Sequence, residues 1–239
     1  KKDGLAPFVL NRLARYRKPI EAEGHAIRFA VARGPLNVAS FLMGTTEFLI
    51  GLRTEPEKIR KLLSMITEYL CRWLQVQKAA FDSIDGILVL DDIVGFCGEP
   101  DFLEFAKPYL QQVFNAFPAA VKFFHNDADG RVCAPHLPDL GVNMFNFSFL
   151  HSLTEMKEWT HNQVVLVGNL PPRDTLALGS AEDVFRQVQE TIGSVSDKTR
   201  ILLSAGGGMP DGVRSENITA FLHAVECKQV NVLSGADVK

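Results

Sequence analysis

Short apolar runs alternate along the chain with longer segments in which apolar residues recur every three or four positions. The runs have the length of buried strands, and the longer segments have the spacing of one-faced helices. Strands that alternate with helices through short connections predict a parallel sheet with right-handed crossovers. The predicted strands are 26–32, 86–90, 121–125, 143–147, 163–167, 200–203 and a last strand-like piece at 229–233.

Helix starts carry their own signals. Thr54, with Pro56 and with Glu57 three residues later, has the pattern of a capping box with proline in the first turn. Ser180 with Asp183 three residues later predicts another helix start in the same way. The predicted helices are 5–23 with a break near Pro19, 36–52, 56–80, 101–117 with a kink or restart at Pro108, 132–140, 150–159, 180–192 and 215–225.

The alternation predicts the α/β class. About six strand–helix units and a possible last strand are present, whereas eight units close a barrel. Either the sheet is open, or one or two units precede Lys1. Because the chain shows no internal repeat, low-complexity linker or shift in composition, we expect a single domain over residues 1–239.

Composition narrows the function classes. The net charge of −3, with both signs interspersed, gives no electrostatic case for binding nucleic acid or an anionic membrane. No apolar run approaches the roughly 18 residues that span a bilayer, and residues 1–4 lack the apolar segment of a signal peptide. The four cysteines form no C-x-x-C pair and are typical of reduced thiols. We therefore expect a cytoplasmic protein.

The run 121–125 delivers chemistry at its end. His125 and Asp127 are two residues apart, and on a strand this spacing directs both side chains to one face. Such a pair can share a metal ion or act as an acid/base pair in which the carboxylate orients the imidazole. In the structural alternative, His125 bonds to a backbone carbonyl and Asp127 begins an Asx turn toward Gly130.

Two adjacent acids, Asp91 and Asp92, directly follow the run 86–90. They repel each other unless one is protonated, paired or bound to a cation; alternatively, one caps the next loop and the other is solvated. After the run 200–203, the glycines 206–208 could present backbone amides to an anionic group or form a plain turn. They match neither the P-loop nor the dinucleotide fingerprint.

Other polar residues complete a predicted ring at the carboxyl ends of the strands, where parallel α/β proteins bind ligands. Arg33 is the one cation at a predicted strand end and could hold a carboxylate. Cys133 is either close to the His125 loop or an inert helix residue, and the histidines 136, 151, 161 and 223 are predicted at the surface. We assign His125, Asp127 and Asp91 to catalysis. Arg33, Asp92, Asn146, Asn169 and Gly207 are assigned to substrate binding.

At these positions the chain resembles the uroporphyrinogen decarboxylase family, which contains a haem-pathway decarboxylase and cobalamin-linked methyltransferases. The resemblance covers nearly the whole chain and rests on the order and spacing of short motifs. They are Gly34-Pro35-Leu36 with Ala39-Ser40, Glu55-Pro56-Glu57, Asp91-Asp92, Phe105-Ala106-Lys107-Pro108-Tyr109, His125, Gly141-Val142-Asn143, Gly168-Asn169-Leu170-Pro171-Pro172, Gly207-Gly208-Met209-Pro210 and Glu216-Asn217-Ile218.

The resemblance implies a (β/α)8 TIM-type barrel. Members of the family are usually longer at the N-terminus, so we expect this chain to lack one or two N-terminal βα units. The resemblance also implies a homodimer and a small-molecule substrate.

The metal site implied by the methyltransferase branch is altered here. That branch binds zinc through His-x-Cys after one strand and through a distant cysteine in a Gly-Cys turn. The histidine matches His125, but the cysteine positions match Asp127 and Gly207. Such a site holds Zn²⁺ less tightly and suits metals that prefer oxygen donors. His125, Asp127 and either Asp91 or Asp92 would supply three ligands.

The decarboxylase branch fits less well. It carries an arginine-rich substrate motif near its N-terminus, which this chain does not contain. It also has a histidine in a Leu-Gly-His-Gly turn where this chain has the glycines 206–208. Porphyrinogen decarboxylation is therefore disfavoured.

Three functions remain open. In the first, a zinc or other divalent-metal site, or an acid site, at His125 and Asp127 activates a methyl acceptor, and a corrinoid protein or a small methylated compound is the donor. The second is a lyase that decarboxylates an acidic substrate held by Arg33, with Asp91 stabilising the cation that forms on protonation. The third is a barrel that binds a ligand without chemistry. The polar residues at several strand ends favour an enzyme, and we take the first forward.

Overall fold

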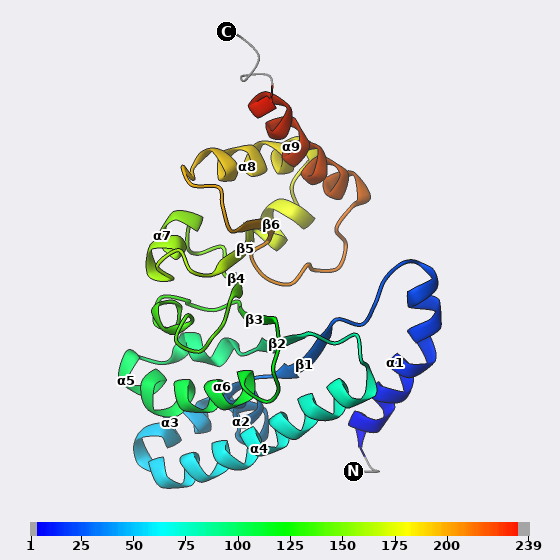
Figure 1. Ribbon diagram of the computed structural model, residues 1–239. Coiled ribbons are helices and arrows are strands. Elements are labelled where there is room, and N and C mark those ends of the chain that lie inside the picture. Colours follow the sequence, from blue (N-terminus) through cyan, green and yellow to red (C-terminus); the bar gives the residue numbers. More distant parts are fainter. Residues whose placement is uncertain (1–3, 234–239) are drawn as a thin grey trace.

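A computed structural model describes residues 4–233 of the chain. Six parallel strands form one sheet in chain order, and helices connect them (Figure 1). The predicted α/β class is therefore confirmed. The strands are β1 (Phe29–Arg33), β2 (Gly86–Leu90), β3 (Val121–Asn126), β4 (Met144–Phe147), β5 (Val165–Leu170) and β6 (Ile201–Ala205).

The helical segments follow the chain as expected of βα units. The segment between β1 and β2 is the longest and holds three helices. In order, the segments are α1 (Leu5–Ala22), α2 (Pro35–Met43), α3 (Thr45–Thr54), α4 (Pro56–Ala80), η1 (Asp92–Phe96), α5 (Glu99–Asp101), the π-helical η2 (Phe102–Ala106), α6 (Lys107–Phe114), η3 (Ala134–His136), α7 (Leu153–Trp159), the π-helical η4 (Pro172–Ala177), α8 (Ala181–Gly193) and α9 (Ser215–Leu233).

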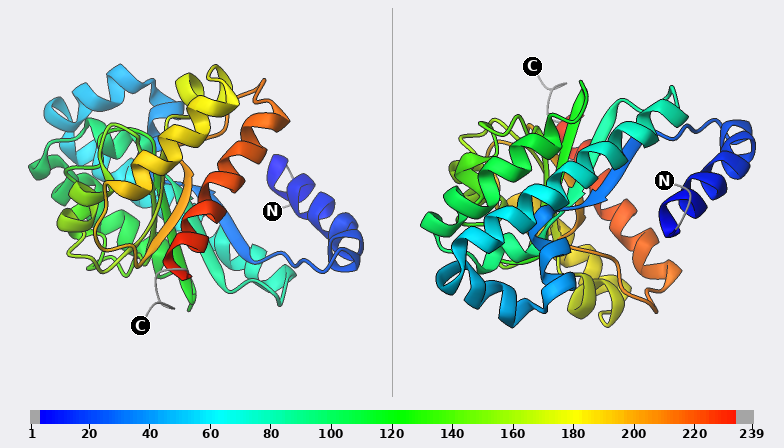
Figure 2. Two further views of the ribbon diagram at one scale, coloured as in Figure 1. Left: turned by 90° about the horizontal axis from the view of Figure 1, so that it is seen from above. Right: turned by 90° about the horizontal axis from the view of Figure 1, so that it is seen from below.

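The sheet is curved but not closed. Within residues 4–233 the edge strands β1 and β6 do not pair with each other, and α1 and α9 lie beside this opening (Figure 2). Asn146 on β4 donates hydrogen bonds to Val167 O on β5 and to Ala205 O on β6. In a flat sheet β4 and β6 would be about 9–10 Å apart, beyond the reach of one asparagine. The six strands therefore bend toward a barrel.

Two neighbouring strands sort their residues onto opposite faces. Phe124 on β3 stands beside Phe145 on β4, and their rings stack with centroids 5.7 Å apart. Both rings are fully buried. The next pair in register, His125 and Asn146, faces the opposite side because strand side chains alternate. Packing of the phenylalanines thus fixes where the polar pair points.

The chain between β1 and β2 differs from prediction in two places. The helix predicted over 36–52 is two helices, α2 and α3, which meet at Gly44 with a φ of 91°. The capping box predicted at Thr54 is wrong: Thr54 is the last residue of α3, and Glu55 precedes α4 as its N-cap residue. Of this pattern only the proline in the first turn of α4 is confirmed, because Thr54 still belongs to α3 and Glu55 makes no side-chain cap.

Two further predicted elements, the strand at 229–233 and the helix over 132–140, differ in the structure. The strand predicted at 229–233 is wrong, because these residues continue α9. The alternation of polar and apolar residues there fits a strand, but five residues are too few to exclude a helix. The helix predicted over 132–140 is only the short η3. The capping box of Ser180 and Asp183 is confirmed at the start of α8.

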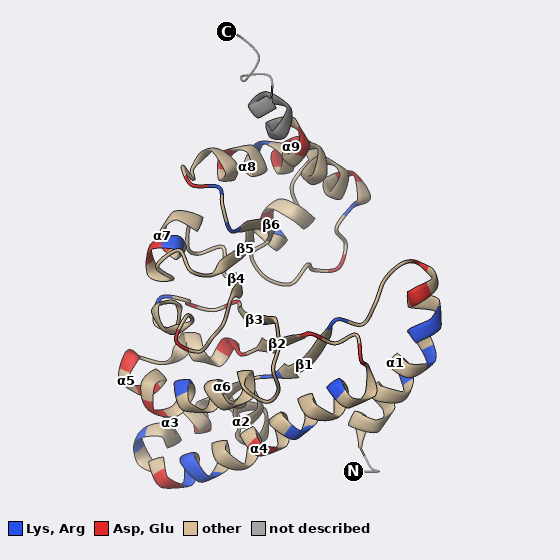
Figure 3. Cartoon of the chain, viewed as in Figure 1, with Lys and Arg blue, Asp and Glu red and all other residues tan. Residues whose placement is uncertain are grey.

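Lys, Arg, Asp and Glu residues are spread along the outer helices, with both signs interspersed (Figure 3). Within residues 4–233, no single helix is long and apolar enough to cross a bilayer. The helices α2 and α3 reach that length and hydropathy only together, and they are bent by 106° at their junction. Residues of α2 from Pro35 to Ser40 contribute to the buried core.

Candidate functional site

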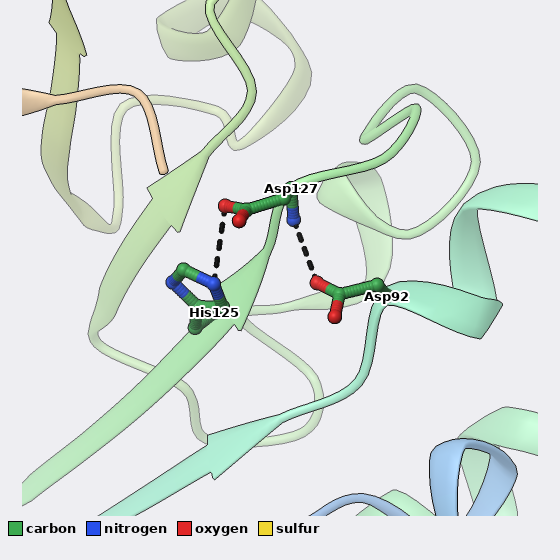
Figure 4. A group of neighbouring side chains, drawn as sticks. All are labelled: Asp92, His125 and Asp127. Atoms are coloured by element: carbon green, nitrogen blue, oxygen red, sulfur yellow. Dashed lines mark hydrogen bonds and ion pairs between the residues drawn. The ribbon is translucent and has the colours of Figure 1, made fainter. Parts of the chain in front are cut away.

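Three side chains meet where β2 and β3 end. Asp92 follows β2, His125 lies near the end of β3, and Asp127 follows β3 (Figure 4). His125 Nε2 is 3.1 Å from Asp127 Oδ1, and the backbone N–H of Asp127 donates to Asp92 Oδ1 at 2.9 Å. One nitrogen or oxygen ligand atom from each residue lies within 4.8 Å of the other two. Within residues 4–233, this is the one such group able to hold a metal ion.

Arg33 joins this group from the end of β1. Its Nη1 lies 4.0 Å from Asp92 Oδ2, and its side chain is 52% exposed. The guanidinium therefore compensates part of the negative charge and keeps donors free toward solvent. The residues predicted at three different strand ends are thus brought together.

The loop after β6 closes against the same group. A Cβ added to Gly207 would lie 2.9 Å from Asp127 Oδ1, and the φ of Gly207 is 134°. Only glycine suits this conformation and this close approach. The amide of Gly206 already donates to Leu170 O, so it is not available to an anionic group, which was one of the two roles left open for the glycine turn.

His125 is held on its other ring nitrogen by β4. Its Nδ1 lies 2.7 Å from Asn146 Oδ1, and its side chain is only 15% exposed. Burial acts to lower the pKa of His125, but the hydrogen bond and charge of Asp127, together with Asp92 and Asn146, outweigh it and raise that pKa. The imidazole therefore favours a positive partner, either a proton or a cation, at this position.

Asp91, predicted as a catalytic residue, lies elsewhere. It is fully buried, and its Oδ2 and Oδ1 accept the N–H groups of Leu36 and Asn37 at 2.9 Å each. These amides are in the first turn of α2, which has no cap from its own side chains. Burial raises the pKa of Asp91 to about 7, although both amides act in the opposite direction. Asp91 thus caps α2, and Asp92 is the acid beside His125.

Gly34 faces Asp91 so closely that replacing it is a test of this cap. We expect Gly34→Ala to destabilise the fold by about 1–3 kcal/mol, since the new Cβ would overlap the buried Asp91 carboxylate. Chemical denaturation measures the difference. Gly98→Ala is the matched control. Gly98 has nearly the same φ and ψ as Gly34, and a Cβ added to it would lie 3.8 Å from its nearest contact, Pro100 Cδ. Equal losses in both variants would contradict the prediction.

A second histidine–carboxylate pair was missed by the sequence. His151, predicted at the surface, is 6% exposed, and its Nε2 lies 2.9 Å from Asp129 Oδ1. Its ring also packs edge-on against Trp159 with centroids 5.0 Å apart. The available signal was position: Asp129 shares the loop of Asp127, and His151 follows β4. The contact between His151 and Asp129 therefore holds the loop after β3, which also carries Asp127, in place.

Asn169 and Cys133 both make hydrogen bonds within the protein. Asn169 on β5 donates to the carbonyl of His151. Cys133 is buried, its Sγ donates to Gly130 O at 3.4 Å, and burial raises its pKa to about 12. Because the thiolate is the ligand form of cysteine, Cys133 offers no thiolate near neutral pH.

The sequence matches one family model along most of its length. The model described as Uroporphyrinogen decarboxylase (URO-D) matches residues 1–227. Uroporphyrinogen decarboxylase 2, chloroplastic, of Oryza sativa subsp. japonica is 21% identical over 230 residues, which cover 92% of this chain and 57% of that protein. The methylated-thiol–coenzyme M methyltransferase of Methanosarcina mazei is 22% identical over 239 residues, which cover 99% of this chain and 62% of that protein.

Solved structures share the fold. A methyltransferase from Methanosarcina mazei superposes with a TM-score of 0.80 at 20% identity and covers 94% of this chain and 65% of its own. A B12-independent methionine synthase from Shewanella sp. W3-18-1 superposes with a TM-score of 0.66 at 14% identity. The match covers 98% of this chain and 69% of that protein. The chain thus shares the α/β fold of these proteins, with a six-stranded sheet that does not close within residues 4–233, and it spans 57–62% of the length of the two curated relatives.

Proposed function

Because the chain belongs to the uroporphyrinogen decarboxylase family, we propose that it is an enzyme of the methyltransferase-like side of that family. Its site would be the group Asp92, His125 and Asp127. The acceptor is activated there, and the methyl donor is a corrinoid protein or a small methylated compound. The observation that carries the proposal is the convergence of the three donor atoms within 4.8 Å at the carboxyl ends of β2 and β3.

The donor set fits a divalent metal ion. Zinc lies about 2.0–2.2 Å from nitrogen and oxygen ligands, so two ligands of one tetrahedral ion are about 3.3–3.6 Å apart. The 3.1 Å between His125 Nε2 and Asp127 Oδ1 is slightly shorter than this spacing, and a small shift of either side chain would make room for the ion. An imidazole with two carboxylates contains no thiolate and suits zinc or a metal that prefers oxygen. When bound, such an ion supplies a Lewis acid that lowers the pKa of an acceptor such as a thiol.

The chain's own residues would divide the remaining tasks. The side chain of Asp127 is 44% exposed, and its carboxylate oxygen that is not a metal ligand can take the proton that the acceptor releases. Arg33, with its free donors, would orient an acidic group of the acceptor or donor beside Asp92. Similarity to a methyltransferase along 99% of the chain supports the choice of reaction class.

A lyase is the second candidate, and Arg33 is the observation that favours it. A guanidinium 4.0 Å from Asp92 can hold a substrate carboxylate beside acids that stabilise a cationic intermediate. The rice relative described above is a uroporphyrinogen decarboxylase, which also fits this second candidate. The third candidate is a binding protein that holds such an acid without turnover.

Methyl transfer can be tested with a free corrinoid. Methylcobalamin and a panel of small thiols and amines are incubated with the purified protein without oxygen. We expect the acceptor to lose its proton and gain the methyl group while Co(III)–CH3 becomes Co(I), which is followed by absorbance and by the mass of the product. His125→Ala should lower the rate at least about 100-fold.

Each other outcome points to one alternative. Release of CO2 from a carboxylic acid, lost in Arg33→Ala and without methyl transfer, would replace the proposal by the lyase. Saturable binding of an acid with no turnover would replace it by the silent barrel. Methyl transfer unaffected by His125→Ala would remove the proposed site.

A further inference from the structure

The side-chain amide of Asn146 has only one chemically sensible orientation. Its Nδ2 lies 2.6 Å from Val167 O and 3.0 Å from Ala205 O. Both partners are carbonyl oxygens, which accept hydrogen bonds and cannot donate them. The flipped amide would place an oxygen against two oxygens. Hence the amide nitrogen faces β5 and β6, and the amide oxygen faces β3.

This orientation determines which nitrogen of His125 carries a proton. The oxygen of Asn146 is an acceptor and lies 2.7 Å from His125 Nδ1. Nδ1 must therefore be the N–H donor of that bond. In the neutral ring the other nitrogen, Nε2, then has a lone pair instead of a proton. Free histidine prefers the opposite tautomer, so the protein imposes this one.

The imposed lone pair points at the candidate site. Nε2 lies 3.1 Å from Asp127 Oδ1, and neither atom of the neutral ring–carboxylate pair can donate to the other. The arrangement is favourable only when a proton or a cation lies between them. A ring nitrogen presented in this way is the form that binds metals.

We propose that Asn146 is the positioning residue that locks His125 in its Nδ1–H tautomer and aims Nε2 at the site. Asn146 is itself fixed by strands β5 and β6, so the tautomer depends on the curvature that brings Ala205 within reach of β4. All three of these contacts of Asn146 are made within the protein, and its predicted role in substrate binding stays a prediction. The tautomer follows from the hydrogen bonds of Asn146 alone, whereas its use in catalysis rests on the proposed function.

The tautomer can be measured without metal or substrate. Correlation of ring nitrogens with ring protons in ¹⁵N-labelled, metal-free protein at alkaline pH distinguishes Nδ1–H from Nε2–H, and the His125→Ala spectrum assigns the signal. We expect Nδ1–H in the wild type and Nε2–H in Asn146→Leu. Asn146→Asp loses the donor to the two carbonyls, as Asn146→Leu does, but it keeps an acceptor beside Nδ1 and should keep Nδ1–H. A purely structural role would not separate these two variants.

Asn143→Leu is the matched control. Asn143 also bridges backbone groups beside β4, accepting from Lys122 N and donating to Ala120 O, but at the opposite end of the strand. We expect its loss to leave the tautomer of His125 unchanged. Thermal unfolding of all variants reports the purely structural cost separately.

Metal affinity supplies the second readout. Titration with Co²⁺ should show binding about 10- to 100-fold weaker in Asn146→Leu and closer to wild type in Asn146→Asp. An Nε2–H ring in the wild type, or an Nδ1–H ring that persists in Asn146→Leu, would overturn the inference. Wild-type protein with the Nδ1–H ring but no affinity for Co²⁺ would support the tautomer lock and contradict the metal site proposed above.

Discussion

His125→Ala is expected to lose a metal ion that the wild type retains. Wild-type protein purified without chelator should contain close to one divalent ion per chain by mass spectrometry, since one imidazole and two carboxylates converge at the site. Removing the only nitrogen ligand of this group leaves two carboxylates, one of them 44% exposed. We expect affinity to fall by at least about 100-fold and the ion to be absent from the purified variant.

The control for this experiment is His25→Ala. His25 is an exposed histidine that follows α1 and lies outside the group, so its variant should keep the metal. Circular dichroism of both variants excludes loss of the fold as the cause. A wild type without metal would turn the search toward metal-free decarboxylation or a binding barrel.

Asp91→Ala is expected to have the largest effect on stability. The change leaves the buried amides of Leu36 and Asn37 without their acceptor and removes the cap of α2. Each of the two amides left without its acceptor costs about 1–2 kcal/mol, so we expect a total loss of about 2–4 kcal/mol in the free energy of unfolding. Denaturation by urea, compared at one pH, measures it.

Asp92→Ala is the matched control for Asp91→Ala. The two aspartates are neighbours, but the side chain of Asp92 is 31% exposed and points to His125 and Arg33. We expect Asp92→Ala to change the free energy of unfolding by less than about 1 kcal/mol and to weaken metal binding. Asp91→Ala should instead lower the free energy of unfolding and leave metal binding unchanged. If Asp92→Ala proves the more destabilising of the two, the division of roles is wrong.

The stability contributed by Asp91 should depend on pH. Its pKa is about 7 in the folded protein and near 3.8 when unfolded, so between these values the folded state binds more protons. The contribution is complete below about pH 4 and is lost as the pH rises through 7. The difference in free energy of unfolding between the wild type and Asp91→Ala should therefore become smaller from pH 5 to pH 8. A difference that grows would show that the amide hydrogen bonds lower the pKa of Asp91 by more than burial raises it.

Much of the site followed from the positions of polar residues at strand ends. His125 and Asp127 were placed on one face by their spacing, and they do lie 3.1 Å apart. The sequence could not decide between Asp91 and Asp92. That choice depends on Gly34 and the first turn of α2, which are distant in the chain and reach Asp91 only through the pairing of β1 with β2.

Longer-range relations were also out of reach. Asn146 appeared as one polar residue at a strand end, whereas its role depends on carbonyls of two other strands. His151 appeared as a surface residue because nothing local shows that Asp129 and Trp159 enclose it. The positions of most helices were predictable from periodicity, while the break at Gly44 and the continuation of α9 were not.

The capping of α2 by Asp91 also has a consequence for the order of folding. The first turn of α2 is completed by a side chain 55 positions further along the chain, so it gains this acceptor only after β2 has paired with β1. Closing that loop costs entropy before the bond forms. We therefore expect α2 to consolidate after the β1–β2 pair, and changes at Gly34 to accelerate unfolding while leaving the folding rate almost unchanged.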